Sequence, residues 1–291
     1  MKIVQSVINQ FENLKITEKF VPDAIHAINI LNKLIKDDES TTIYELLDNI
    51  KNAITAIISE SKTVSTSSCT ELFMGYITLK TLDQSDISKS KQILLDRALK
   101  FSFKLSKQID TISQFCYKYL INKNCILIMS MSKGFTPLMK KIIENNDPII
   151  YVLCDSSESI KYITKDDLPL SNRIKLISFA EIGRVLGTVD VILTESQAIV
   201  ESGGIIGNVG TFTTALCAKQ FKIPIYICSE SYKFVRFCPI RQSCIDTYLE
   251  SLMEEKSKLD YTPPNYIDLI FTDIGVLTPY AAANELIKIY L

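Results

Sequence analysis

The sequence predicts an α/β protein in which an all-helical N-terminal domain precedes a domain built on a mostly parallel sheet with helices on both faces. The first observation behind this prediction is the distribution of glycine and proline: residues 1–122 contain one of each, and residues 123–291 contain eight of each. Both residue types interrupt helices and build turns. The second observation is a change of apolar pattern at the same point, from a helical period to short continuous runs. We therefore predict domains over 1–122 and 123–291.

The helical half is predicted from the spacing of its apolar residues. From Leu94 to Tyr119 they recur every three or four residues, which is the period of one helix face. This spacing predicts one long helix from about 86 to 121. Pro22 suits the first turn of an earlier helix, because its fixed φ is compatible with that position. The earlier helices are expected over 2–15, 22–36, 41–60 and 68–81.

The C-terminal half is predicted to alternate between strands and helices. Short apolar runs rich in β-branched residues are typical of strands that are buried on both faces of a parallel sheet. Such runs cover residues 125–129, 149–154, 174–177, 189–193, 225–228 and 269–271. Helices are expected over 136–144, 179–185, 211–221 and 279–290. Alternation of this kind indicates a sheet with helices on both faces.

Composition and charge exclude several classes of function. The chain has 32 Lys and Arg against 33 Asp and Glu, and a net charge of -1 leaves no basic surface for nucleic acid or an anionic membrane. No apolar run reaches the ~18 residues that a membrane-spanning helix needs, and no secretory signal is recognised near Met1. We therefore expect a cytoplasmic protein that binds neither nucleic acid nor membrane.

The eight cysteines and the single histidine, His26, bear on metal binding. The cysteines form no C-x-x-C pair, and a zinc site needs clustered Cys and His ligands, so we predict no metal site. Several cysteines, such as Cys125 and Cys228, lie in apolar runs, which is typical of reduced core thiols. His26 lies among apolar residues of a predicted helix with no identifiable Ser or Cys partner, so we predict a structural role for it.

The segment 201–211 is rich in glycine and precedes a predicted helix. Gly203, Gly204 and Gly210 let the backbone approach a ligand, and the exposed N–H groups at the helix start, near Thr211, favour an anion. The segment is neither a P-loop nor a G-x-G-x-x-G motif, so binding of ATP, GTP or a dinucleotide is not supported. The alternative interpretation is a strand-to-helix turn without a ligand.

Two lysines and a hydroxyl cluster are further candidates for binding an anion. Lys133 and Lys233 each follow a predicted strand, and ligands of open α/β sheets bind outside the carboxyl ends of strands. The alternative for each lysine is a solvated surface charge. Ser67 and Ser68 belong to a Ser/Thr-rich stretch, 65–70, that is typical of a helix N-cap region. Offering hydroxyls to a phosphate is the second interpretation of these serines.

Several segments resemble the family of alpha, beta and delta subunits of translation initiation factor 2B. In the C-terminal half the similar segments are 200–206, 217–219, 230–236, 261–264 and 269–279. In the helical half, Ser67-Ser68 followed by Glu71-Leu-Phe73 is similar as well. The resemblance covers nearly the whole chain and is strongest from 197 to the end. The final residues, Glu285-Leu-Ile-Lys-Ile-Tyr-Leu291, favour the alpha type of subunit.

The resemblance implies both a fold and a function. The implied fold is a helical N-terminal domain on a Rossmann-like C-terminal domain, through which two copies form a homodimer. The implied function is that of a regulatory, non-catalytic subunit that bridges a guanine-nucleotide exchange complex with beta, gamma, delta and epsilon subunits. In the family, this type of subunit helps to sense initiation factor 2 whose own alpha subunit is phosphorylated. No cofactor is implied.

The same superfamily includes sugar-phosphate isomerases, and the resemblance implies how this chain differs from them. Those enzymes use a cysteine after the first α/β strand and an aspartate before the glycine-rich turn, as an acid/base pair. The matching positions here are Ser130 and Gln197, and a glutamine does not exchange a proton near neutral pH. The enzymes also carry Asn-Lys in the turn, where this chain has Gly207-Asn208.

We therefore expect no catalytic residues. The alternative function is that of a sugar-phosphate-binding sensor, or an isomerase with a rearranged site. The residues assigned to a sugar phosphate or other anion are Ser67, Ser68, Lys133, Gly203, Gly204, Gly210, Thr211 and Lys233.

Overall fold

The computed structural model describes residues 2–78, 87–153, 163–169, 172–250 and 259–290. Contacts between residues divide the chain into two compact units. We call Met1–Lys107 with Leu249–Glu255 the helical unit, and Gln108–Tyr248 with Lys256–Leu291 the α/β unit. The division falls within the long helix α5 (Ile87–Leu120), which ends close to the predicted boundary at residue 122.

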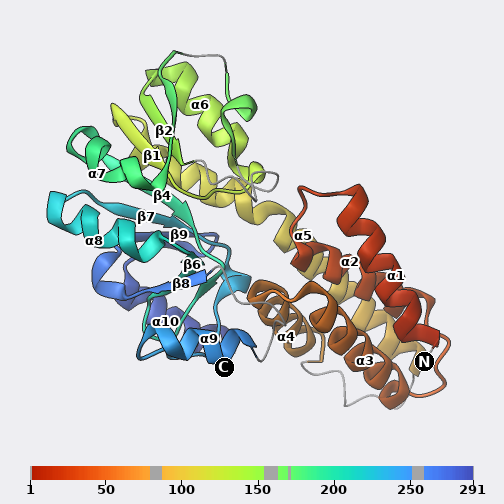
Figure 1. The fold of residues 1–291 in the computed structure, drawn as a ribbon. Helices are drawn as coiled ribbons and strands as arrows, with labels where there is room; N and C mark the ends of the chain where they lie inside the picture. Colours follow the sequence, from red (N-terminus) through yellow and green to blue (C-terminus); the bar gives the residue numbers. More distant parts are fainter. Residues whose placement is uncertain (1, 79–86, 154–162, 170–171, 251–258, 291) are drawn as a thin grey trace. The chain divides into compact units, whose positions relative to one another are not determined.

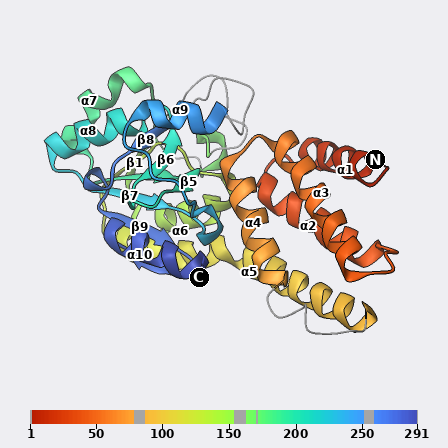
Figure 2. The ribbon, with the colours of Figure 1, turned by 90° about the horizontal axis from the view of Figure 1, so that it is seen from below.

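The helical unit contains the first part of α5 and the helices that precede it, coloured red to yellow in Figure 1. Those helices are α1 (Lys2–Thr17), α2 (Asp23–Asp37), α3 (Ile43–Ser61) and α4 (Val64–Thr78). Helix α1 packs against α2 and α3, and Figure 2 shows these three helices side by side. The apolar stripes of α1, α2, α3 and α4 meet in an interior that includes Phe11, Leu31, Ile57 and Phe73.

Helix α4 begins earlier than predicted. We expected a start at residue 68, with 65–70 as the N-cap region, but the helix begins at Val64 and contains that stretch. Thr63 provides the reason, because its hydroxyl accepts a hydrogen bond from the Thr66 N–H at 3.4 Å and donates to the Thr66 hydroxyl at 2.7 Å. The predicted end of this helix, 79–81, and the predicted first residue of α5 lie outside the described residues.

The α/β unit is built on a seven-stranded sheet with the order β10-β9-β7-β4-β1-β2-β3. Neighbouring strands are parallel, except that β10 is antiparallel to β9. The predicted strands are all present, with ends shifted by at most two residues, and Cys154 lies outside the described residues. The strands are β1 (Cys125–Ile128), β2 (Ile149–Leu153), β3 (Ile174–Ile177), β4 (Val191–Glu195), β7 (Ile225–Cys228), β9 (Leu269–Thr272) and β10 (Gly275–Leu277).

Helices cover both faces of this sheet, as the sequence predicted. Alternate residues of a strand point to opposite faces. Ile126 and Ile128 of β1 belong to a core with the second part of α5 and α6 (Thr136–Asn146). Cys125 and Leu127 belong to a core on the other face. The helices of that face are α7 (Ile182–Val185), α8 (Thr211–Phe221) and α10 (Pro279–Tyr290).

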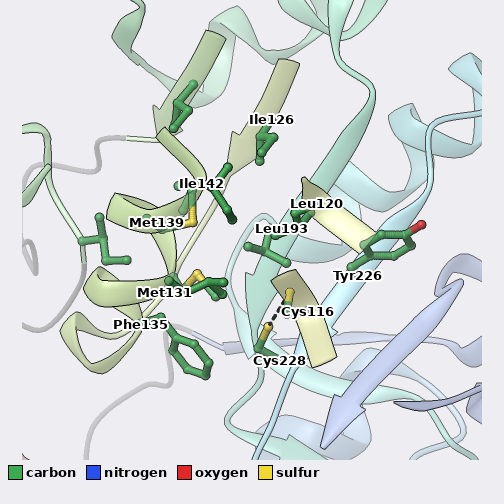
Figure 3. Close-up of a cluster of buried hydrophobic side chains, with 14 of the residues drawn as sticks. Cys116, Leu120, Ile126, Met131, Phe135, Met139, Ile142, Leu193, Tyr226 and Cys228 are labelled. Atoms are coloured by element: carbon green, nitrogen blue, oxygen red, sulfur yellow. Dashed lines mark hydrogen bonds between the residues drawn. The ribbon is translucent and has the colours of Figure 1, made fainter. Parts of the chain in front are cut away.

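Figure 3 shows the core beneath α5 and α6. Met131, Phe135 and Met139 fill the space beside the strands. The Sγ atoms of Cys116 and Cys228 lie 3.9 Å apart within this core, and both thiols are free. Buried free thiols of this kind agree with the predicted reduced core cysteines.

Several elements were not predicted, and the strands among them, of two to four residues, are too short to show a clear period. Three antiparallel strands form a second sheet in the order β5-β6-β8, and a helix, α9 (Gln242–Glu250), follows the loop after β7. The strands are β5 (Ala198–Ile199), β6 (Ile205–Asn208) and β8 (Leu259–Thr262). Within the described residues, every helix is too short or too polar to cross a membrane.

Candidate functional site

The strand order identifies where this sheet is expected to bind a ligand. From β1 the chain adds β2 and β3 on one side, and then β4, β7 and β9 on the other. The order therefore reverses between β1 and β4. In open α/β sheets, ligands bind outside the carboxyl ends of the strands at such a reversal. We call the residues that gather there, Ser130, Ser132, Glu195, Glu230 and Lys233, the switch-point site.

Lys233 lies in the switch-point site, where two carboxylates of the chain already pair with it. The lysine ends the short 3-10 turn Ser231–Lys233 that follows β7. Its ammonium Nζ is 2.6 Å from Oε1 of Glu195 and 2.7 Å from Oε2 of Glu230. The three side chains are only 7%, 9% and 2% exposed, respectively. Lys233 is therefore a buried member of an ion cluster and not a solvated surface charge.

The pKa values of this cluster follow from burial and from charge pairing. Burial alone would lower the pKa of Lys233, but the carboxylates of Glu195 and Glu230 outweigh burial and raise the pKa above its usual value. Burial raises the pKa of Glu230, and the charge of Glu195 adds to this, whereas Lys233 opposes it. The lysine stays charged, and two acidic groups compete for it.

The loop after β1 completes the switch-point site. The Ser132 N–H donates to Oε2 of Glu195 at 2.7 Å, so one carboxylate joins this loop to Lys233. The hydroxyl of Ser132 is buried and has no hydrogen-bond partner among the described residues. Deeper in the sheet, the hydroxyls of Ser130 and Thr194 lie 3.1 Å apart. A threonine hydroxyl is not a base, so this pair does not activate Ser130 as a nucleophile.

A second polar group continues along the same edge of the sheet, beyond β7. Asp273, which follows β9, accepts hydrogen bonds from the Ser231 N–H at 2.7 Å and the Ser231 hydroxyl at 2.9 Å. It also accepts from the Gln108 side-chain amide of α5 at 3.1 Å. The carboxyl edge from β1 to β9 is thus lined by two groups of polar side chains, one around Lys233 and one around Asp273.

Lys133, the other lysine candidate, lies at the start of the 3-10 turn that precedes α6. Its ammonium is 2.9 Å from Oδ1 of Asp167, and both side chains are 21% exposed. Burial alone would raise the pKa of Asp167, but hydrogen bonds from Lys133 and Thr164 outweigh it and hold the pKa below its usual value. Lys133 therefore also has a carboxylate partner within the chain.

Gly203 and Gly204 form the turn of the β5–β6 hairpin, and packing explains both. The φ of Gly203 is +79°, a backbone conformation that residues with a side chain rarely adopt. A Cβ at this position would also overlap the carbonyl group of Pro279. A Cβ at Gly204 would lie 2.6 Å from the ring of Tyr261. The backbone needs these glycines to approach other parts of the chain, with or without a ligand.

The start of α8 is where the sequence predicted an anion, and the chain supplies a carboxylate there. The backbone N–H groups of Gly210 and Phe212 donate to Oδ2 of Asp260 at 2.8 Å and 3.1 Å. The Thr211 hydroxyl donates to the carbonyl of Asn208 at 2.7 Å. Burial raises the pKa of Asp260 to about 6, although the two N–H donors lower it. Asp260 thus holds the position that an external anion would take.

Ser67 and Ser68 lie within α4 of the helical unit. Ser68 is buried, and the carbonyl of Ser67 accepts a hydrogen bond from the Thr70 hydroxyl at 3.0 Å. Gln197, the other position compared with the isomerases, lies between β4 and β5, where its N–H donates to the carbonyl of Ile206 at 2.8 Å. Phosphate binding by the two serines stays a prediction.

Sequence reasoning missed the carboxylates that pair with the predicted cationic and N–H groups. Glu230 precedes Lys233 by three residues, a spacing at which ion pairs form on a helical turn, so this pair could have been found. Glu195 lies two residues after the end of an apolar run, which is also a recognisable signal. Asp260 gave none, because it lies 50 residues from Gly210. Within the described residues, no group of three or more His, Cys, Asp or Glu side chains could hold a metal ion.

Comparisons with known proteins agree with this architecture. The profile of the Initiation factor 2 subunit family matches residues 22–279. The chain is 32% identical to translation initiation factor eIF2B subunit alpha of Dictyostelium discoideum, over 98% of this chain and 96% of that protein. It is 23% identical to ribose 1,5-bisphosphate isomerase of Pyrococcus furiosus, over 85% and 82% of the two chains. A chain of the tetrameric eIF2B-beta2-delta2 complex from C. thermophilum has the same fold, with a TM-score of 0.75, 16% identity and coverage of 99% and 95%.

The fold and the site define an α/β protein with a helical N-terminal part and a polar switch-point site whose lysine is paired internally. The chain belongs to the Initiation factor 2 subunit family. The family resemblance that the sequence motifs indicated is thereby confirmed.

Proposed function

We propose that this chain is a regulatory, non-catalytic alpha-type subunit of the translation initiation factor 2B exchange complex in the cytoplasm. The observation that carries the proposal is its 32% identity to the eIF2B alpha subunit of D. discoideum over 98% of the chain. A match over nearly the full length of both proteins extends to the helical unit as well as to the sheet. This extent favours a shared role of the whole chain over a shared fold alone.

The geometry of the switch-point site supports a role without covalent chemistry. Ser130 is hydrogen-bonded to another hydroxyl, and Gln197 carries an amide that neither donates nor removes a proton near neutral pH. Lys233 is paired with two carboxylates. An isomerase needs an acid and a base next to its substrate, and these residues do not provide such a pair.

In this proposal the chain forms a homodimer and bridges an assembly with beta, gamma, delta and epsilon subunits. It helps that assembly to sense initiation factor 2 with a phosphorylated alpha subunit. The test is affinity purification of the tagged full-length chain from native extract, followed by identification of its partners. Recovery of the other subunits, and a mass of twice 32.9 kDa for the purified chain alone, is the expected result. A stable monomer that retains none of these subunits would contradict the proposal.

The regulatory part of the proposal has its own test. Nucleotide exchange on initiation factor 2 is measured with the complex assembled with and without this chain, in the presence of phosphorylated initiation factor 2. We expect the phosphorylated factor to inhibit exchange more strongly when the chain is present. Equal inhibition in both assemblies would contradict a role of the chain in sensing phosphorylated initiation factor 2, and bridging would be its only proposed role.

Sugar-phosphate binding or isomerisation is a second candidate, favoured by the similarity to the ribose 1,5-bisphosphate isomerase of P. furiosus. The test is incubation of the purified chain with a panel of ribose phosphates, with thermal shift for binding and product analysis for turnover. A ligand at 100-fold its dissociation constant stabilises the folded state by about 2.7 kcal/mol, which is readily measured. Absence of both effects would remove this candidate.

A further inference from the structure

Two hydrogen-bond donors of the switch-point site converge on one carboxylate. The Lys233 ammonium is 2.6 Å from Oε1 of Glu195, and the Ser132 N–H is 2.7 Å from Oε2. Ser132 immediately precedes the 3-10 turn that leads into α6, so the turn itself provides no acceptor for its N–H. A lysine ammonium and a backbone N–H of this kind are the groups with which proteins hold phosphates and carboxylates.

We infer that Glu195 is an internal substitute for an anionic ligand: its carboxylate fills the oxyanion position of the switch-point site and thereby excludes phosphates and carboxylates from it. The inference deepens the proposed non-catalytic function and rests on it. Glu195 is then the residue that determines ligand specificity at this place. An anion that entered the site would have to displace a side chain of the protein from both donors.

The other charges around the site also disfavour the binding of an anion. Glu230 approaches Lys233 to 2.7 Å, so the buried cluster contains two carboxylates for one ammonium. Asp273 lies on the same edge of the sheet, hydrogen-bonded to Ser231. A phosphate at this edge would face acidic groups in a buried environment, where repulsion between like charges is strong.

Glu195, rather than Glu230, is the substitute for a ligand because of where each residue lies in the chain. Glu230 is three residues from Lys233, at the start of the same 3-10 turn. Glu195 ends β4 and connects the loop after β1 with the loop after β7. Removing the side chain of Glu195 therefore takes its acceptor from the Ser132 N–H and leaves Lys233 with Glu230 alone, whereas removing that of Glu230 leaves both donors bound to Glu195.

The test is chemical rescue of Glu195→Ala in the full-length chain. Acetate, inorganic phosphate and ribose 5-phosphate are each titrated at constant ionic strength against chloride, with the melting temperature and calorimetric binding as readouts. We expect acetate or phosphate to raise the melting temperature of Glu195→Ala in a saturable manner, and to leave the wild type at its chloride value. Glu144→Ala, at an exposed position of α6, is the matched control and should behave as the wild type does.

Two further variants keep the inference falsifiable. Glu195→Gln fills the same space with a neutral amide, so it should gain little anion binding, and Glu195→Ser serves if the alanine variant does not fold. Saturable phosphate binding by the wild type that is lost in Lys233→Met would overturn the inference. So would a folded Glu195→Ala or Glu195→Ser that gains no anion binding.

The result of the rescue experiment can be distinguished from the result of the partner-recovery experiment that tests the proposed function. Partner recovery by the wild type tests the subunit role and involves no anion. If the partners are recovered but the wild type binds phosphate through Lys233, only the role of Glu195 fails. If no partner is recovered but Glu195→Ala is rescued by acetate, only the subunit role fails.

Discussion

The helical unit and the α/β unit differ in the polar groups that they bury. In the described part of the helical unit, the buried polar residues are hydroxyl-bearing side chains and one histidine: His26, Ser61, Thr66, Ser68, Thr70 and Ser90. The α/β unit also buries hydroxyls, but in addition it buries Glu195, Glu230 and Lys233, all at the carboxyl ends of parallel strands. The charged interior of the described chain is therefore confined to one edge of one sheet.

This difference shows which parts of the chain are explained by packing alone. A hydroxyl in a helix bonds to a nearby backbone carbonyl, as Thr70 does with the carbonyl of Thr66 at 2.9 Å, and needs no distant partner. A buried charge loses its hydration and persists only when another charge compensates it. The helical unit thus needs little beyond its apolar stripes, whereas the α/β unit maintains a costly ion cluster where a ligand is expected.

The largest predicted effect comes from breaking the ion cluster of the α/β unit. Lys233→Met leaves Glu195 and Glu230 buried without their cation, so we expect the free energy of unfolding to fall by roughly 3–5 kcal/mol at pH 7. Because burial raises the pKa of Glu230, protonation relieves the repulsion, and the loss should be smaller at pH 5 than at pH 8. Denaturant unfolding at the two pH values measures this.

Lys288→Met is the control, because Lys288 is 69% exposed although it also pairs with a glutamate, Glu285, at 2.6 Å. We expect a change within about 0.5 kcal/mol for this variant. A similar loss in both lysine variants would show that the buried cluster is no more important to stability than a surface pair.

A glycine pair compares the two units at the level of the backbone. Gly203→Ala in the α/β unit forces a positive φ on alanine and a clash with Pro279, so we expect a loss of roughly 2–3 kcal/mol. Gly75→Ala in α4 of the helical unit meets no atom within 4 Å and should stabilise the chain by about 0.5–1 kcal/mol. Melting temperatures of the two variants decide the comparison, and a shift of the same sign in both would contradict it.

A further comparison concerns the pH dependence contributed by Asp260. Its pKa in the folded chain is about 6, above the usual 3.8, so the folded state binds its proton more tightly than the unfolded state does. The stability contributed by this group is present in full below about pH 4 and is lost as the pH rises through 6. We therefore expect Asp260→Asn to gain stability relative to the wild type as the pH rises from 4.5 to 7.5. A constant difference between the two proteins over this range would show that the pKa of Asp260 is not raised.

The sequence was sufficient to predict the helices and strands whose apolar pattern extends over enough residues to be recognised. The apolar period predicted α5 from about 86 to 121, and the structure has Ile87–Leu120. The buried runs predicted every parallel strand of the large sheet. By contrast, β5 and β6 are too short to show a period, so the segment that holds Gly203 and Gly204 was interpreted as a single glycine-rich turn.

The site was predictable in part. Lys133, Lys233 and the start of α8 were identified as places for an anion, because each follows from the position of a strand or a helix. What those places bind depends on residues that no local pattern connects to them. Asp167, Glu195 and Asp260 each pair with a group that lies far from them in the chain.

The sequence by itself determined the alternation of strands and helices, the family and the places where donors for an anion are exposed. These properties follow from composition, period and short motifs, which are local. Only the tertiary structure decided that the chain fills those places with its own carboxylates. Glu195 is 38 residues from Lys233, and Asp260 is 50 residues from Gly210. Charges so far apart in sequence meet only because parallel strands bring their carboxyl ends to one edge and β8 pairs with β6 beside α8.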